Sequence, residues 1–209
     1  MGGPEIVTEG SGWHEQTADR ADVDLTYTAS ARTRADAVRE LGRQVAAAEP
    51  HLGHRAVQVR HRRLWVHNEW RGRRVVGCRA GQEISLRLTD VAALEEVLSA
   101  LIGTEPSGLN GPRWLLDDRA SALREAQRRA VEDARHRAEG YAEALGGRIG
   151  ALLLLSEAAE HGPVAYRAMD MAESGGAGGG PDVRDLGLEP EPVRVSARCT
   201  TRWTLITES

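Results

Sequence analysis

Residues 117–147 form the longest periodic segment of the chain, DDRASALREAQRRAVEDARHRAEGYAEALGG. Mostly small apolar residues recur in it at spacings of three and four, which places them on one face of an α-helix. These residues are Ala120, Leu123, Ala126, Ala130, Ala134, Ala138, Tyr141 and Leu145. Asp117 or Asp118 is suited to cap its start, and Gly146 with Gly147 to end it. The segment predicts a helix of about 27 residues, roughly 40 Å long, which a sheet can approach closely.

The composition predicts one domain with an ordinary apolar core. The chain has 209 residues, 41% of them hydrophobic, so it needs neither disulfides nor metal to hold a core. A formal net charge of -4 gives no global attraction to nucleic acid or acidic membranes. All 27 basic residues are arginine, which excludes lysine Schiff-base chemistry and a phosphate-loop lysine.

Targeting signals are absent from the sequence as it stands. The N-terminal MGGPEIVTEGSG has neither the basic flank nor the apolar run of a secretory signal, and no apolar run is long enough to span a membrane. A cytoplasmic location without a membrane span is therefore expected. With only Cys78 and Cys199 present, a disulfide scaffold is not expected.

The first half of the chain alternates between strand and helix patterns. Residues 6–13 are weakly extended and are interrupted by Gly-Ser-Gly, whereas residues 21–31 alternate apolar and polar side chains as a strand does. Thr33 has the spacing of a helix cap, and the helix it opens is expected to run to about Ala48 and to stop at Pro50.

A hairpin or meander is predicted for residues 54–88. The alternation slips near residues 61–63, which indicates a bulge, and Arg71-Gly72-Arg73 is the expected turn. A second helix is predicted at 90–102 and a short strand at 113–116.

The chain closes with two predicted strands separated by a loop. The apolar run at 149–155 predicts a buried strand, and residues 193–205 have the longest period-two pattern of the chain. Between them, 172–192 contain six glycines and three prolines and are expected to form a flexible loop. The predicted fold is α+β, a single domain over residues 1–209 with a mixed or antiparallel β-sheet packed against two shorter helices and one long helix.

Four blocks of the sequence resemble the SIMPL domain family (DUF541). They are VTEGSG at 7–12 with DRADVDLTYTASA at 19–31, VVGCRAGQEISLRLTD at 75–90, residues 114–157 with the alanine-rich helix and apolar strand, and VRVSARCTTRWTL at 193–205. The resemblance implies an α+β fold and a tendency, in some bacterial members, to form ring-like or channel-like assemblies. The family has no established catalytic residues to carry over.

Eight arginines lie between His51 and Gly81, and Glu69 is the only acidic residue in this segment. Trp65 and Trp70 lie among them. A basic hairpin with aromatic residues is typical of single-stranded nucleic-acid binding. The alternative is a solvated face that pairs with acidic segments such as 82–118, within the fold or across a subunit contact. The candidate interaction surface consists of Arg55, Arg60, Arg62, Arg63, Arg71, Arg73 and Arg74.

The remaining chemistry-bearing residues have simpler interpretations. The pairs His51 with His54 and His61 with His67 match no metal-ligand spacing, so no metal or cofactor is expected. Cys78 next to Arg79 is more typical of a small buried side chain than of a nucleophile.

Two hypotheses follow. The first is a non-enzymatic cytoplasmic protein that acts by homo-oligomeric assembly or protein interaction, in stress or envelope physiology. The alternative is a single-stranded nucleic-acid binder that uses the arginine-rich segment. An enzyme ranks third because no reaction can be named for it.

Overall fold

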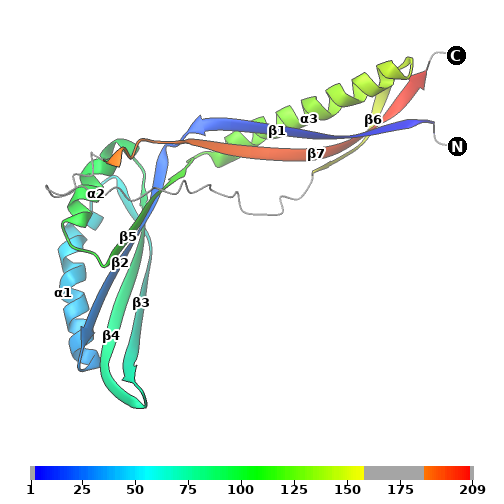
Figure 1. Cartoon of the computed structure of the whole chain (residues 1–209). Helices are drawn as coiled ribbons and strands as arrows, with labels where there is room; N and C mark the ends of the chain where they lie inside the picture. Colours follow the sequence, from blue (N-terminus) through cyan, green and yellow to red (C-terminus); the bar gives the residue numbers. More distant parts are fainter. Residues whose placement is uncertain (1–2, 158–185, 208–209) are drawn as a thin grey trace. The chain divides into compact units, whose positions relative to one another are not determined.

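The computed structural model describes residues 3–157 and 186–207, and these form two antiparallel sheets and three α-helices. In chain order the elements are β1 (Glu5–Thr17), β2 (Arg20–Ala31), α1 (Arg34–Leu52), β3 (Val57–Arg71), β4 (Arg74–Leu88), the 3₁₀ helix η1 (Val91–Ala93), α2 (Leu94–Ile102), β5 (Gly108–Leu115), α3 (Arg119–Ala144), β6 (Gly147–Glu157) and β7 (Pro192–Thr207). The chain divides into two compact units. Unit 1 contains β1, α3, β6 and β7, and unit 2 contains the elements between Thr17 and Asp117. The predicted α+β fold is confirmed (Figure 1).

The long helix α3 begins where the sequence predicted. The carboxylate of Asp118 accepts a hydrogen bond from the Ser121 backbone N–H at 2.8 Å and caps the helix. Its buried face, however, is a strict row of every fourth residue, Ala122, Ala126, Ala130, Ala134, Ala138 and Ala142. The prediction that Tyr141 and Leu145 share this face is wrong, since each is 62% exposed. A row of every fourth residue is inclined by about 26° to the helix axis, so the strands that cover it cross the helix obliquely.

Strand β1 lies directly against the backbone of α3. A methyl group built on Gly10 would be 2.0 Å from the Ala130 carbonyl oxygen, and one on Gly12 would be 2.3 Å from that of Ala126. Only glycine leaves room for this approach. The prediction that Gly-Ser-Gly interrupts the first strand is therefore wrong, because β1 continues through it to Thr17.

Hydroxyl groups complete the contact between β1, β7 and α3. The Thr8 hydroxyl donates to the Ala134 carbonyl at 2.7 Å and lies 3.0 Å from the Thr201 hydroxyl. The Trp203 indole N–H donates to Thr201 Oγ1 at 2.9 Å. Thr8 and Thr201 are both buried, so these bonds replace the water that their hydroxyls lose on folding.

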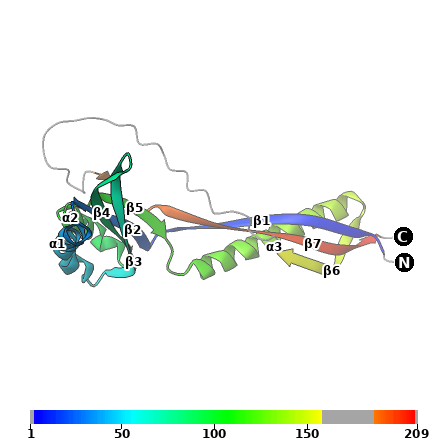
Figure 2. The ribbon, with the colours of Figure 1, turned by 90° about the horizontal axis from the view of Figure 1, so that it is seen from below.

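The three-stranded sheet of unit 1 has the order β1-β7-β6, which Figure 2 shows with β6 at the side of β7 away from β1. Alternate residues of β7, including Val195, Ala197 and Cys199, are buried, as the period-two pattern predicted. The prediction of a buried strand at 149–155 is correct for the strand and wrong for its burial. Leu152, Leu153, Leu154 and Leu155 are between 44% and 49% exposed, because β6 is the edge strand and α3 packs mainly on β7.

The sheet of unit 2 has the order β3-β4-β2-β5 and packs α1 and α2 on one face (Figure 1). Its helix-facing residues follow the predicted alternation. They include Val23, Leu25, Tyr27 and Ala29 of β2 and Ile84, Leu86 and Leu88 of β4, all buried. The short strand predicted at 113–116 is longer than expected, since β5 begins at Gly108.

Helix α1 starts at the predicted cap but ends later than predicted. Thr33 Oγ1 accepts from the Asp36 backbone N–H at 3.2 Å. The helix then continues through Pro50 to Leu52. A proline in the last turn gives up only its own N–H bond, and the Gly53 N–H still closes the helix on the Glu49 carbonyl at 3.2 Å.

The hairpin of β3 and β4 confirms both features predicted for it. The strand register shifts between Val59 and His61, next to the expected bulge. Gly72 takes a φ of 61° in the turn, and Arg71 pairs with Arg74 across it. A second register shift, between Glu69 and Trp70, has no counterpart in the sequence pattern.

The loop and the absence of a membrane span, both expected from the sequence, can be compared only with the described residues. Residues 172–185 of the predicted Gly/Pro-rich loop lie outside the described residues, and Pro192, its last residue, already belongs to β7. None of the helices in the described part of the chain is long and apolar enough to cross a membrane.

We expect Gly10→Ala to destabilise unit 1. The added methyl group overlaps the backbone of α3, and overpacking of this kind costs about 1–3 kcal/mol of unfolding free energy. Gly140→Ala is the control, because a methyl group there meets no atom within 4 Å and alanine is favoured over glycine in a helix by up to about 1 kcal/mol. Urea unfolding followed by circular dichroism measures both; equal losses would show that the close approach is not a constraint.

Candidate interaction surface

The face of the unit 2 sheet opposite α1 and α2 is lined by polar and charged side chains. Outward-pointing positions alternate with the buried ones, and the strand register places them side by side. They are Asp22, Asp24, Thr26, Thr28 and Ser30 of β2, Arg79, Glu83, Ser85 and Arg87 of β4, His61, Arg63, Trp65, His67 and Glu69 of β3, and Arg113 of β5. We call this set the open face.

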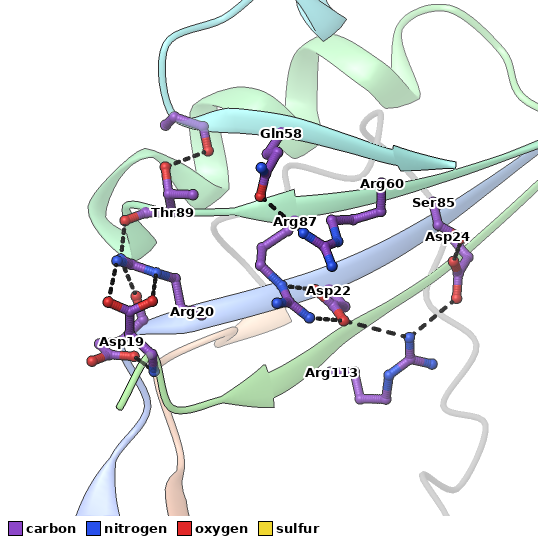
Figure 3. Close-up of polar contacts among 12 residues, drawn as sticks. Asp19, Arg20, Asp22, Asp24, Gln58, Arg60, Ser85, Arg87, Thr89 and Arg113 are labelled. Atoms are coloured by element: carbon purple, nitrogen blue, oxygen red, sulfur yellow. Dashed lines mark hydrogen bonds and ion pairs between the residues drawn. The ribbon is translucent and has the colours of Figure 1, made fainter. Parts of the chain in front are cut away.

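Asp22 is the centre of an ion-pair network on the open face (Figure 3). Arg87 donates two hydrogen bonds to its carboxylate, at 2.7 Å and 2.9 Å. Arg113 lies 3.9 Å from Asp22 and 3.5 Å from Asp24, and Asp24 also accepts a hydrogen bond from Ser85. The hydrogen bonds that Arg87 donates to the Asp22 carboxylate raise the pKa of Arg87. These two arginines are therefore already neutralised within the fold.

A second network holds the end of the sheet next to Asp117. The Arg20 guanidinium pairs with the Asp117 carboxylate at 3.0 Å and donates to the Thr89 carbonyl. The Asp117 backbone N–H donates to Asp19 Oδ1 at 2.7 Å (Figure 3). The network joins the start of β2 to the residue after β4, so its role is to fix strand ends.

An aromatic platform occupies the β3 side of the open face. The Trp65 ring lies over Gly81, where an added methyl group would be 2.2 Å from the indole. His67 stacks on the same ring with centroids 5.0 Å apart. Arg63 is on the same face of the same strand and makes no hydrogen bond or ion pair with any described residue. The platform and Arg63 together are suited to stacking against a planar anionic ligand.

The seven predicted arginines do not form one patch. Arg62 faces α1, where its guanidinium binds the Glu49 carboxylate, with Nη2 3.0 Å from Oε2. This bond lowers the pKa of Glu49 and raises that of Arg62. Arg60, at the bulge, donates to Gln58 Oε1 at 3.4 Å (Figure 3).

The other members of the set lie at the ends of the hairpin. Arg55 precedes β3, and Arg71, Arg73 and Arg74 surround the turn that follows it. β3 contains 15 residues, and at about 3.3 Å per residue it separates these ends by roughly 50 Å. The sequence-predicted surface is therefore divided between the two ends and the two faces of the hairpin.

The other sequence candidates have structural partners. His61 Nε2 lies 3.2 Å from the Ser85 hydroxyl, and His54 Nδ1 accepts from the Ala56 N–H at 3.2 Å. Cys78 is buried on the helix-facing side, with Sγ 3.4 Å from Asn68 Oδ1. Within residues 3–157 and 186–207, no group of three or more His, Cys, Asp and Glu side chains is placed to hold a metal ion.

The model of the SIMPL family, described as a protein of unknown function (DUF541), matches residues 6–203. The chain belongs to the SIMPL family. The resemblance noted in the sequence is thus confirmed, and the match runs through both units. That residues 1–209 form a single SIMPL domain stays a prediction. No curated protein matches the chain.

The Asp22 network was not found from the sequence, although a signal for it exists. Asp22 and Asp24 occupy alternate polar positions of β2, and Arg87 occupies one of β4. Their pairing depends on the register between strands 65 residues apart, as in the bond between Asp22 and Arg87. A single sequence does not contain that register.

We expect Asp22→Ala to destabilise unit 2 of the SIMPL protein by about 1–3 kcal/mol, because it leaves the half-buried Arg87 without its counter-charge, whereas Arg113 keeps Asp24 at 3.5 Å. Glu40→Ala removes the same charge from an exposed pair with Arg43 on α1 and is expected to change stability by less than about 0.5 kcal/mol. Thermal unfolding of both variants measures the difference. A Glu40 variant as unstable as the Asp22 variant would contradict the central role of Asp22.

Proposed function

We propose that this SIMPL protein is non-enzymatic and acts by assembly, with itself or with other proteins, through β6 of unit 1. The observation that carries the proposal is the leucine run of this strand. Leu152–Leu155 expose between 44% and 49% of their surface in a strand with a sheet neighbour on one side only among the described residues. Exposed apolar edge strands are templates for pairing with another chain.

The geometry of β6 explains why both of its faces offer apolar surface. Its register with β7 shifts between Ile149 and Leu152 and again between Leu152 and Leu154. Successive residues of a strand point to opposite faces, so a run of four leucines places apolar side chains on both faces, and the shifts disturb the pairing with β7 within this run. Tyr141 and Leu145, at the end of α3 just before β6, add two further exposed apolar side chains to unit 1.

Two acidic side chains of α3 have pKa values set by contacts on the helix surface. Arg128, followed by Arg129, lowers the pKa of Glu125 to about 2. The Ser11 backbone N–H, followed by Arg137, lowers the pKa of Asp133. Shifts of this kind arise from ion pairs and hydrogen bonds on a helix surface, whereas catalytic groups are perturbed by burial in a cleft. A cytoplasmic location and a role in stress or envelope physiology stay predictions.

The assembly proposal predicts that the protein is oligomeric at micromolar concentration and that Leu153→Ser with Leu154→Ser weakens association. Removing two half-exposed leucines from an interface is expected to raise the dissociation constant by about 10- to 100-fold. Leu64→Ser is the control, because Leu64, at 58% exposed, is more exposed than either leucine but belongs to unit 2. Multi-angle light scattering over a dilution series measures the mass. A strictly monomeric native protein, or an equal effect of the control, would contradict the proposal.

Single-stranded nucleic-acid binding is the second candidate function. The stack of Trp65 and His67 favours it, and so does Arg63, which forms no ion pair or hydrogen bond with a described residue. The pairing of Arg79 with Glu69, at 3.1 Å, and of Arg87 with Asp22 counts against it, because these arginines have less charge to offer a phosphate. Any binding on the open face is therefore expected to depend on a few side chains of β3.

Two adjacent arginines on opposite faces of β3 distinguish this candidate. If the open face binds single-stranded RNA, Arg63→Ala removes one phosphate contact and lowers the salt slope of binding by about 1. Arg62→Ala should leave the slope unchanged, because Arg62 faces α1 and pairs with Glu49. Fluorescence anisotropy of a labelled oligonucleotide over a salt series measures both variants. Equal slopes for the two variants, or binding insensitive to salt, would contradict nucleic-acid binding by the open face.

A further inference from the structure

The β3–β4 hairpin extends beyond the rest of the unit 2 sheet. β2 pairs with β4 only as far as Ala31 opposite Cys78. Residues 69–77 continue past this point as a two-stranded arm, which Figure 1 shows extending beyond the end of α1. The side chains at its end are therefore free to meet a partner.

The turn of the arm concentrates positive charge that the fold does not offset. Arg71 and Arg74 are direct cross-strand partners, and Arg73 lies in the turn between them. None of the three forms an ion pair or a hydrogen bond with a described residue. The nearest acid along β3, Glu69, is already paired with Arg79 at 3.1 Å. Like charges directly opposite each other destabilise a hairpin, so an anionic partner would relieve the repulsion.

The neighbouring positions of the arm carry apolar side chains. Trp70 and Val75 are cross-strand partners and are 61% and 42% exposed. Val76, at the register shift, is 52% exposed. Because successive residues of a strand point to opposite faces, the Trp70–Val75 pair and the Arg71–Arg74 pair lie on opposite faces of the tip. The tip is thus amphipathic over a few residues.

We propose that the tip of the β3–β4 hairpin, residues 70–76, binds the surface of an anionic phospholipid bilayer. The arginines pair with lipid phosphates, and Trp70 and the two valines enter the interface between headgroups and acyl chains. A nucleic acid would also neutralise the arginines, but it would leave Val75 and Val76 in water. The exposed apolar side chains of Trp70, Val75 and Val76 therefore favour a lipid surface over a nucleic acid. This proposal is independent of assembly through β6, which belongs to unit 1.

Vesicle co-sedimentation with the full chain tests the charge requirement. We expect binding to phosphatidylcholine vesicles that contain about 30% phosphatidylglycerol, no binding to pure phosphatidylcholine, and weakening by salt. Each arginine near such a surface contributes about fivefold in affinity, so Arg71→Gln, Arg73→Gln and Arg74→Gln together should reduce binding about 100-fold. The control combines Arg55→Gln, Arg60→Gln and Arg63→Gln, which removes the same charge elsewhere on the hairpin segment and should reduce binding less than about threefold.

A second variant tests the apolar requirement without changing charge. Trp70→Ala with Val75→Ser should weaken binding to the same vesicles by about 10-fold or more, because both side chains leave the interface. Thermal unfolding of each variant checks that unit 2 remains folded. Equal losses in the two arginine variants, equal binding to neutral vesicles, or no effect of the apolar variant would overturn the proposal. Tip-dependent binding to a single-stranded RNA with no binding to vesicles would overturn it in favour of a nucleic-acid surface.

Discussion

The close approach between the β1 backbone and the α3 backbone is the constraint on which unit 1 depends. Gly10 and Gly12 leave no side chain between strand and helix, so Thr8 can donate to the Ala134 carbonyl and the Ser11 N–H can reach Asp133 at 2.9 Å. A helix face made of alanine suffices for such a contact, because little volume remains to be filled. Because β1 and β7 pack so closely on this alanine face, the core cluster of α3 and β7 contains only small side chains, and the larger leucines of β6 stay half-exposed.

The core of unit 2, in contrast to that of unit 1, is built from large apolar side chains. Leucines of α2 and alternate apolar residues of β2 and β4 fill one side of its sheet. On the other side, the acids of β2 lie opposite arginines of β4 and β5, and the network around Asp22 is one result. Most of the arginines on the open face are therefore paired with acidic side chains of the same face. At the end of the hairpin, by contrast, Arg71, Arg73 and Arg74 form no ion pair with a described residue.

Local sequence signals predicted what depends on neighbouring residues. Alternation identified β2 and β7, the Thr33 and Asp118 caps began their helices as expected, and Gly72 marked the turn. Features that depend on distant partners were missed. Glycines in β1 looked like a break because the helix they contact lies more than 100 residues away. A charge count over a segment also ignores faces, and neighbouring Arg62 and Arg63 belong to opposite sides of β3.

The two proposed surfaces differ in chemistry and belong to separately packed units, so they are separable by mutation. They would nevertheless reinforce each other. A tip with three arginines and one tryptophan is a weak membrane ligand by itself, since stable binding to a bilayer generally needs more than one such signal. An oligomer formed through β6 would carry one tip per subunit, and a second tip that reaches the same surface binds at a high effective concentration. Assembly would then set the membrane affinity of the protein without any change at the tip.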